Sequence, residues 1–253
     1  MQLDLGYLAV FLLVFARLTA FIAVFPTFTF TGIPVLAKVG LGFILALVVT
    51  PVVGTGAGLA SSWGYALDLA GEALVGLALG LTAGMVFHAL RIAGQLMGIQ
   101  IGFAVAELLD LSGVQNTVVA ELFFFLSVIF FFSIDGHHAV LAALVKSFEL
   151  IPLTGGVVKG SMVLTVAHFI GGMFATALKL AAPVLAVMVV VDLSLGLMVR
   201  MVPQINVFML GFPLKVAAGL VILAGLLPVF GMVLKKVFDQ MLGDILILIR
   251  GLA

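Results

Sequence analysis

The sequence predicts an all-α, polytopic integral membrane protein with about six apolar spans. Composition is the first reason, because 64% of the 253 residues are hydrophobic and 9% are charged, against about 25% charged residues in ordinary soluble domains. Length is the second, because the apolar runs reach the roughly 20 residues that a helix needs to cross a bilayer. Pattern is the third, because the runs lack the two-residue alternation of membrane barrel strands.

The charge balance excludes several classes of protein. The chain has 11 basic and 11 acidic residues, too few to cover a water-facing surface, so a soluble globular protein is excluded. Its formal net charge is zero and it has no basic stripe, which excludes a nucleic-acid binder. Because it has no cysteine, disulfides, thiolate nucleophiles and sulfur-ligated metals are also excluded. We therefore expect a lipid membrane to surround most of the chain.

The first half of the chain contains four apolar segments. Leu5–Phe25 is interpreted as a retained span and not a signal peptide, because Asp4 stands where a positive region is required. Val35–Val53 and Leu67–Ala89 are the second and third spans. Ile92–Ala106 is short for a span and contains glycine and glutamine, so we expect a separate re-entrant or protein-buried helix.

The second half predicts longer and less regular helices. In chain order these are Val118–Ile134, Ala139–Phe148 after a turn at Asp135-Gly136, Met162–Val191, Val207–Leu234 and an amphipathic tail, Val237–Leu252. Proline inside an apolar run bends a helix, so kinks are expected at Pro183, Pro213 and Pro228. Lys235 and Lys236 favour a cytoplasmic location for the tail. No composition boundary divides the chain, which predicts one domain over residues 1–253.

Glycines recur every four residues in two places. Gly76, Gly80 and Gly84 form one ridge, and Gly94 and Gly98 belong to the second. Such spacing clears one helix face of side chains, so that another backbone can approach closely. The ridges therefore predict dense helix packing, either within one monomer or against other subunits.

A polar stripe follows the second ridge. Its members advance by three or four residues along one helix face: His88, Arg91, Gln95, Gly98 and Gly102. The stripe continues into the most polar stretch of the chain, which ends at Glu121. That stretch is either a loop that lines an aqueous conduit, where irregular backbone is tolerated at membrane depth, or a surface loop outside the bilayer.

Enzyme-like motifs are present but incomplete. Asp135, His137 and His138 are three possible metal ligands, but adjacent histidines are expected to point apart on a helix, and no HExxH companion exists. A turn followed by a helix start is the favoured interpretation. No serine, histidine and carboxylate set can be assembled, so we expect no enzyme activity, no cofactor and no metal.

Several residue strings in register carry a resemblance to a known family. They are AGQLMGIQIGF at residues 93–103, DGHH at 135–138, Ser147-Phe148 with Pro152, RMVPQINVF at 200–208 and GFPLK at 211–215. Their order and spacing resemble the FliR family of flagellar biosynthetic proteins, and the likeness covers nearly the whole chain.

The resemblance implies a core subunit of the bacterial type III export gate in the inner membrane, at the flagellar basal body. In that family one copy assembles with FliP and FliQ copies, built of kinked helix hairpins, into a closed channel that passes unfolded flagellar subunits. FlhB and FlhA are further implied partners.

The family also assigns roles to residues. The segment matching Ile101 to Thr117 is its pore-plugging loop, and the residues assigned to it here are Ile101, Gly102, Phe103, Val105, Leu108, Asp110, Ser112, Gly113, Gln115 and Asn116. Leu111 stands where the family commonly has proline, so the turn is less restrained. Neighbouring subunits are expected to hide the polar residues Arg17, Glu72, Arg91, Gln95, Lys179, Asp192, Arg200, Gln204, Asn206 and Lys215.

Two other functions stay open on the residues alone. A small-molecule secondary transporter would use Glu72, Asp135, His137 and His138 at the membrane midplane, although transporters usually contain an internal repeat and none is found. A virulence injectisome export subunit would share the same plan. An intramembrane enzyme has no nucleophile or ligand set to support it.

Overall fold

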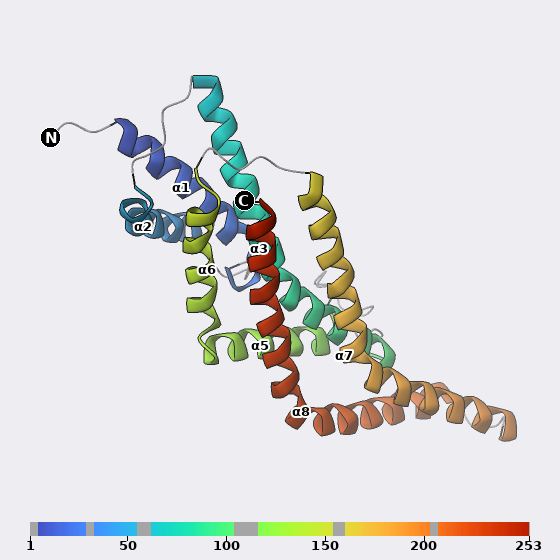
Figure 1. The fold of residues 1–253 in the computed structure, drawn as a ribbon. Helices are drawn as coiled ribbons and strands as arrows, with labels where there is room; N and C mark the ends of the chain where they lie inside the picture. The colour runs from blue at the N-terminus through green and yellow to red at the C-terminus, as the bar shows by residue number, and fades with distance from the viewer. Residues whose placement is uncertain are drawn as a thin grey trace. The chain divides into compact units, whose positions relative to one another are not determined.

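The computed structural model describes residues 5–28, 33–54, 62–103, 116–153, 160–202 and 207–252. Its elements in chain order are α1 (Leu5–Val24), η1 (Pro26–Phe28), α2 (Val35–Val53), α3 (Ser62–Ile101), α5 (Val118–Ser133), α6 (Gly136–Leu150), α7 (Gly160–Met201) and α8 (Val207–Leu252), as Figure 1 shows. The described residues contain no strand, which confirms the all-α class.

Five of these helices are long and apolar enough to cross a membrane, or six if α5 and α6 count as one broken span. The predicted number of about six is therefore confirmed. The boundaries of α1, α2 and α5 lie within one residue of the predicted ones. Pro26 ends α1, because proline disfavours helical backbone in the residue before it.

Residues 92–101 of the predicted segment Ile92–Ala106 form a protein-buried helix, as expected, but this helix is not a separate one. That segment continues α3 without a break as far as Ile101. A glycine inside a helix costs about 0.5–1 kcal/mol relative to alanine, and the apolar spacing outweighs that cost here. Ala89, Ala93 and Met97 recur every four residues and are at most 1% exposed, so one helix face stays buried along the whole segment.

Two more boundaries differ at the carboxyl end. The two predicted helices, Val207–Leu234 and Val237–Leu252, form one continuous helix, α8. Lysine is a good helix former, and the buried series Leu234, Phe238 and Met241 continues across the predicted break. Helix α7 extends ten residues beyond Val191, to Met201. The helix continues through Asp192, because Lys215 and Gln100 of the same chain contact its carboxylate.

The three prolines expected to kink helices lie inside them. Pro183 is in α7, and Pro213 and Pro228 are in α8. Each removes one backbone donor from its helix, and Figure 1 shows a change of direction within both α7 and α8. A kink at each individual proline stays a prediction.

The chain forms two compact units, each assembled from separate stretches of sequence. The first contains Met1–Val86, Ile134–Ile170 and Phe238–Ala253. Its core includes Leu13 and Leu18 of α1, Leu79 of α3, Leu144 of α6 and Phe238 of α8, each at most 3% exposed. The α2 helix packs on α1 through Phe11 and Phe43, whose ring centroids are 5.3 Å apart.

The second unit contains Phe87–Ser133 and Gly171–Val237. Its core joins α3, α5 and α7 through small and apolar side chains: Ala89, Ala93, Met97, Ile101, Val119, Phe123, Ala177, Ala181, Val184 and Met188. Phe230 of α8 packs edge-on against Phe123, with 4.8 Å between the ring centroids. Because the chain enters each unit more than once, neither unit is a contiguous segment, and one domain over residues 1–253 stays a prediction.

Candidate functional site

A buried ion pair lies in the core of the first unit. Arg17 of α1 is 0% exposed and donates from Nε to the Oε2 atom of Glu72 on α3, 2.5 Å away. Glu72 is 2% exposed. An ionised side chain without a partner in such surroundings costs several kcal/mol, so each member of the pair requires the other.

The rest of the guanidinium is also satisfied. One terminal nitrogen donates to Ser147 Oγ at 3.1 Å, and the other donates to the carbonyl oxygen of Ile151 at 3.2 Å. The group lies over the ring of Phe148, 4.2 Å from its centroid, in a cation–π contact. Arg17 therefore ties α1 to α3 and to the carboxyl end of α6. The chain itself buries Arg17 and Glu72, so these two residues do not need the partner subunits that the sequence predicts for them.

The first glycine ridge lies against the same helix. A methyl group built on Gly76 would overlap the carbonyl oxygen of Arg17, and one built on Gly80 would lie 2.8 Å from the carbonyl oxygen of Phe21. Gly84 is buried. Gly76 and Gly80 therefore allow close approach of α1 of the same chain, so these two glycines pack within one monomer.

The predicted polar stripe on α3 holds the start of α5. Arg91 pairs with Glu121 at 3.4 Å and lies 3.9 Å from the ring centroid of Phe124. Asn116 donates to the other oxygen of Glu121 at 3.0 Å. Both Arg91 and Glu121 are about one-third exposed, so their attraction is partly screened by solvent.

Gln95 and Gly98 fix the segment just before α5. The backbone N–H of Thr117 donates to Gln95 Oε1 at 2.8 Å, and the Thr117 hydroxyl caps α5 by accepting from the N–H of Ala120 at 3.2 Å. Thr117 occupies the space that a side chain on Gly98 would need, and Ala120 does the same for Gly94, with its Cα 2.6 Å from a methyl group built there. The second ridge is therefore also packed within the chain.

The carboxyl end of α3 meets the same glycine. Gly102 has a φ of +110°, which favours glycine, and its N–H donates to the carbonyl oxygens of Gly98 and Ile99. The N–H of Phe103 donates to the carbonyl oxygen of Gly98 at 2.9 Å, which completes a Schellman helix end. Gly98 thus contacts both Phe103 and Thr117.

Asp192 joins three helices in the second unit. Its carboxylate pairs with the Nζ of Lys215 on α8 at 2.8 Å and accepts from the Nε2 of Gln100 on α3 at 3.0 Å. Asp192 is 42% exposed and Lys215 23%, so this pair is less enclosed than Arg17 and Glu72.

Comparison with known proteins identifies the family. Residues 8–241 match the family described as "Bacterial export proteins, family 1". The chain belongs to that family. Among its relatives, the "Flagellar biosynthetic protein FliR" of Bacillus subtilis is 34% identical over 233 residues, which cover 90% of each chain. The proteins of the same name from Pectobacterium carotovorum and Escherichia coli are 32% and 29% identical over 236 and 235 residues. They cover 92% and 91% of this chain, and 90% of each relative.

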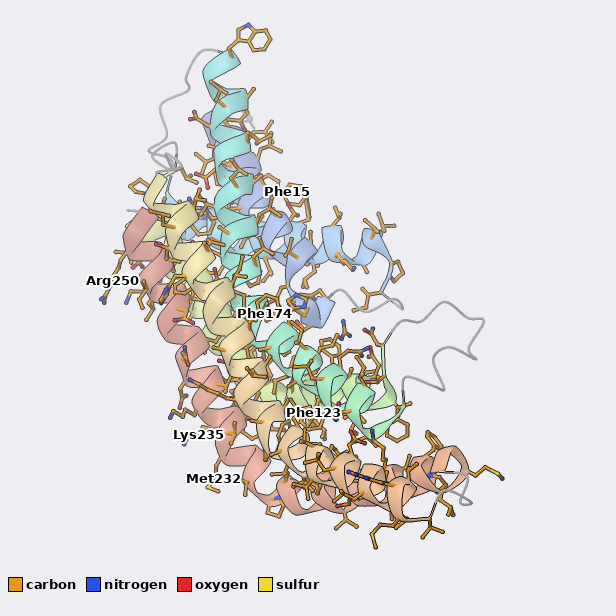
Figure 2. The ribbon with its side chains drawn as sticks, turned by 90° about the vertical axis from the view of Figure 1, so that its right-hand side faces the viewer. Phe15, Phe123, Phe174, Met232, Lys235 and Arg250 are labelled. Carbon is orange, nitrogen blue, oxygen red and sulfur yellow. The ribbon has the colours of Figure 1, made fainter. Side chains whose placement is uncertain are left out.

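In this member of the bacterial export proteins of family 1, the last two helices, α7 and α8, expose many apolar side chains. In an apolar stretch of 18 residues in α7, 17% of the stretch is buried within the chain, and in the corresponding stretch of α8 the share is 6%. Phe174 of α7 and Met232 of α8 are 55% and 70% exposed and project from their helices in Figure 2. Lys179 and Arg200 are exposed on α7 between such side chains, a position that hydrocarbon alone does not suit.

Several predicted site residues fall outside the described part of the chain. These are Val105, Leu108, Asp110, Ser112, Gly113, Gln115, Gln204 and Asn206. Of the other plug residues, Ile101 is buried, whereas Gly102, Phe103 and Asn116 are half-buried.

Sequence reasoning missed several partners in these networks. Gln100, Ser147 and Thr117 are partners in these networks that the sequence does not single out, and no sequence pattern predicts the role of the Ile151 carbonyl. The signal for Ser147 is a lone hydroxyl in an apolar helix, which usually hydrogen-bonds within the protein.

The histidines after the α5–α6 turn also differ from the expectation. His137 and His138 do not point apart, because their ring centroids are 4.1 Å apart with 38° between the planes. Asp135 lies beside them, with its carboxylate oxygen 3.4 Å from His138 Nδ1. The predicted turn and helix start are present at Asp135 and Gly136.

Proposed function

We propose that this chain is the FliR-type core subunit of a flagellar type III export gate in the bacterial inner membrane. Residues 1–253 form one domain, which assembles with FliP-type and FliQ-type subunits into a closed channel. FlhB and FlhA lie beside this channel, and it exports unfolded flagellar proteins. The observation that carries the proposal is the family match over residues 8–241 together with relatives named FliR that align over nine-tenths of both chains.

The distribution of buried and exposed polar residues supports partner subunits. Arg17, Glu72, Gln95 and Asp192 have partners within the chain, but Lys179 and Arg200 lie exposed on the apolar helix α7. A charge at membrane depth is tolerated next to protein or a water-filled cavity, and much less in hydrocarbon. Subunits that pack against α7 and α8 would supply that protein surface.

We further propose that residues 101–117 plug the channel. The support is the way both ends of this segment are held. A Schellman helix end fixes Phe103, and Gln95 with Gly98 fixes Thr117, so the two ends are attached to one turn of α3. A segment attached at both ends can block a channel and move aside without leaving it.

Co-purification tests the assembly. The chain is expected to be extracted from membranes with FliP-type and FliQ-type subunits in a fixed ratio, because its exposed α7 and α8 faces require cover. The measurement is the mass of the detergent-solubilised complex and the ratio of its subunits. A matched comparison is the Lys179→Leu variant, which should weaken assembly if α7 contacts a subunit. A chain that is monodisperse and alone in detergent would contradict the proposal.

Crosslinking tests the plug. Photo-reactive residues at Val105, Leu108 or Gln115 are expected to crosslink to an export substrate stalled in the channel, because a plug must contact whatever displaces it. The control is the same probe in cells that make no stalled substrate, and a probe at the fully buried Phe87 should give no product. Probes that label only lipid would rule out a pore-facing loop.

A further inference from the structure

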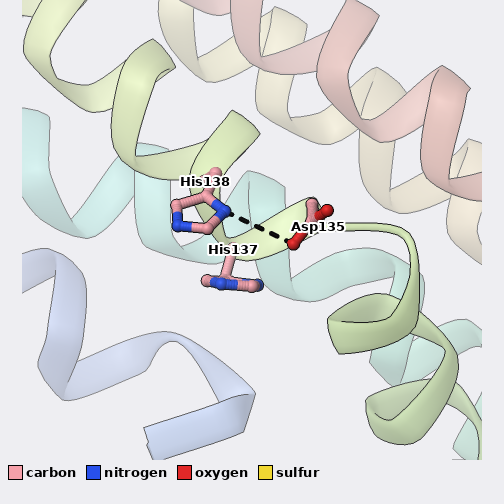
Figure 3. Close-up of side chains that lie close together, drawn as sticks. All are labelled: Asp135, His137 and His138. Atoms are coloured by element: carbon pink, nitrogen blue, oxygen red, sulfur yellow. Dashed lines mark ion pairs between the residues drawn. The ribbon is translucent and has the colours of Figure 1, made fainter.

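Three chemically active side chains gather at the start of α6, and the proposed export function uses none of them. Figure 3 shows Asp135, His137 and His138 converging on one place. One ligand atom from each lies within 4.8 Å of the other two. Asp135 and His138 are 76% and 73% exposed, and His137 is half-buried, so the cluster lies at the surface of this chain.

The backbone creates this convergence. Asp135 has φ 55° and ψ 27°, a left-handed conformation that a non-glycine residue rarely adopts. Aspartate before a helix usually caps it by accepting from a backbone N–H, but the Asp135 side chain makes no such bond. Its carboxylate is directed to His138 instead, and the turn brings residues i, i+2 and i+3 to one side.

The distance between His138 and Asp135 fits metal coordination better than a hydrogen bond. His138 Nδ1 and Asp135 Oδ1 are 3.4 Å apart, beyond the usual 2.7–3.2 Å range for N–H···O bonds. In a tetrahedral zinc centre with bonds of about 2.0–2.1 Å, neighbouring ligand atoms are about 3.3 Å apart. The pair already has that spacing, and the ligand atom of His137 lies within 4.8 Å of both.

The chemistry of the donors selects the ion. Two imidazoles and one carboxylate form the three-ligand set of zinc sites that keep one position for water. Imidazole favours zinc, copper or nickel over magnesium and calcium, which prefer oxygen ligands. The positive end of the α6 dipole disfavours a cation, but the negative charge of Asp135 offsets it.

We propose that Asp135, His137 and His138 bind a divalent transition-metal ion of the zinc class, with water in the remaining position. The ion would link the turn before α6 to the first turn of that helix. The site is independent of the export channel, so it can fail or succeed without regard to the proposed function.

The test is a titration of the full-length chain, in its purified complex and with the affinity tag removed, with Co²⁺ as a visible probe for zinc. The expected result is one Co²⁺ per chain, with the visible absorption of a tetrahedral centre that Zn²⁺ displaces. Loss of an outer-shell partner alone usually costs 10–100-fold in affinity, so the His137→Asn/His138→Asn variant is expected to bind at least about 100-fold more weakly.

The matched control is His168→Asn, the same chemical change at an exposed histidine of α7 outside the cluster. It should leave Co²⁺ binding unchanged. Asp135→Asn, which removes one donor without changing side-chain size, provides a second reading if the double histidine variant does not fold. The absence of Co²⁺ binding by the unaltered chain, or equal binding by the unaltered chain and the cluster variants, would overturn the proposal.

Discussion

Replacing Arg17 by leucine is expected to lower the stability of the folded chain by about 3–5 kcal/mol, the usual cost of leaving a buried charge without its partner. Glu72 is 2% exposed and forms its ion pair with Arg17 inside the core. For a chain of this size the change corresponds to a fall of roughly 6–20 °C in the unfolding temperature. Thermal unfolding of the purified chain in detergent measures it.

Removing both charges should reverse much of the loss. In Arg17→Leu/Glu72→Leu no ion is left buried, and apolar replacement of a buried ion pair is often nearly neutral. Ser147 keeps a hydrogen bond, because its hydroxyl also donates to the carbonyl oxygen of Leu144 at 2.7 Å. The carbonyl of Ile151 loses its donor, so recovery is expected to be incomplete.

The matched control is Lys235→Leu, which removes a cation from the exposed side of α8 (Figure 2). Little change in unfolding temperature is expected there, because substitutions at exposed positions have small effects. If Arg17→Leu unfolds at the temperature of the unaltered chain, or if the double variant is less stable than the single one, the ion pair does not hold α1, α3 and α6 together.

The sequence identifies Arg17 and Glu72 as ions that cannot face lipid, but it does not identify their partners. An ionised residue in an apolar run signals only that a partner exists. These two residues are 55 positions apart, and Ser147 and Ile151 are a further 75 or more away. Their meeting depends on how α1, α3 and α6 pack, which no local pattern encodes. Neighbouring subunits and an internal partner are therefore indistinguishable in the sequence.

Apolar runs predict where helices exist more reliably than where they end. The bounds of α2 follow from Pro34 and Gly54, which stand at its two ends. The breaks expected before Ile92 and at Lys235 do not occur, since buried side chains in helical register continue across both positions. Glycine, glutamine and lysine alter helix propensity by at most about 1 kcal/mol each, and tertiary packing outweighs that.

The glycine ridge on α3 gives the second large effect. Gly76→Ala is expected to destabilise the chain, because the new methyl group would overlap the carbonyl oxygen of Arg17 and force α1 away from α3. Overpacking of this kind typically costs about 1–3 kcal/mol, and more when the obstacle is backbone, which cannot rotate aside. The unfolding temperature should fall, and disulfide crosslinking between cysteines introduced into α1 and α3 should become slower.

Gly171→Ala in α7 separates packing from helix propensity. The substitution is the same and the position is helical, but nothing beyond the adjacent residues and backbone of α7 itself lies within 4 Å of the added methyl group. Alanine favours a helix over glycine by about 0.5–1 kcal/mol, so this variant should unfold at a slightly higher temperature. The two substitutions therefore have opposite expected signs. Equal shifts would mean that propensity alone decides both, and that α1 does not lie tightly against Gly76.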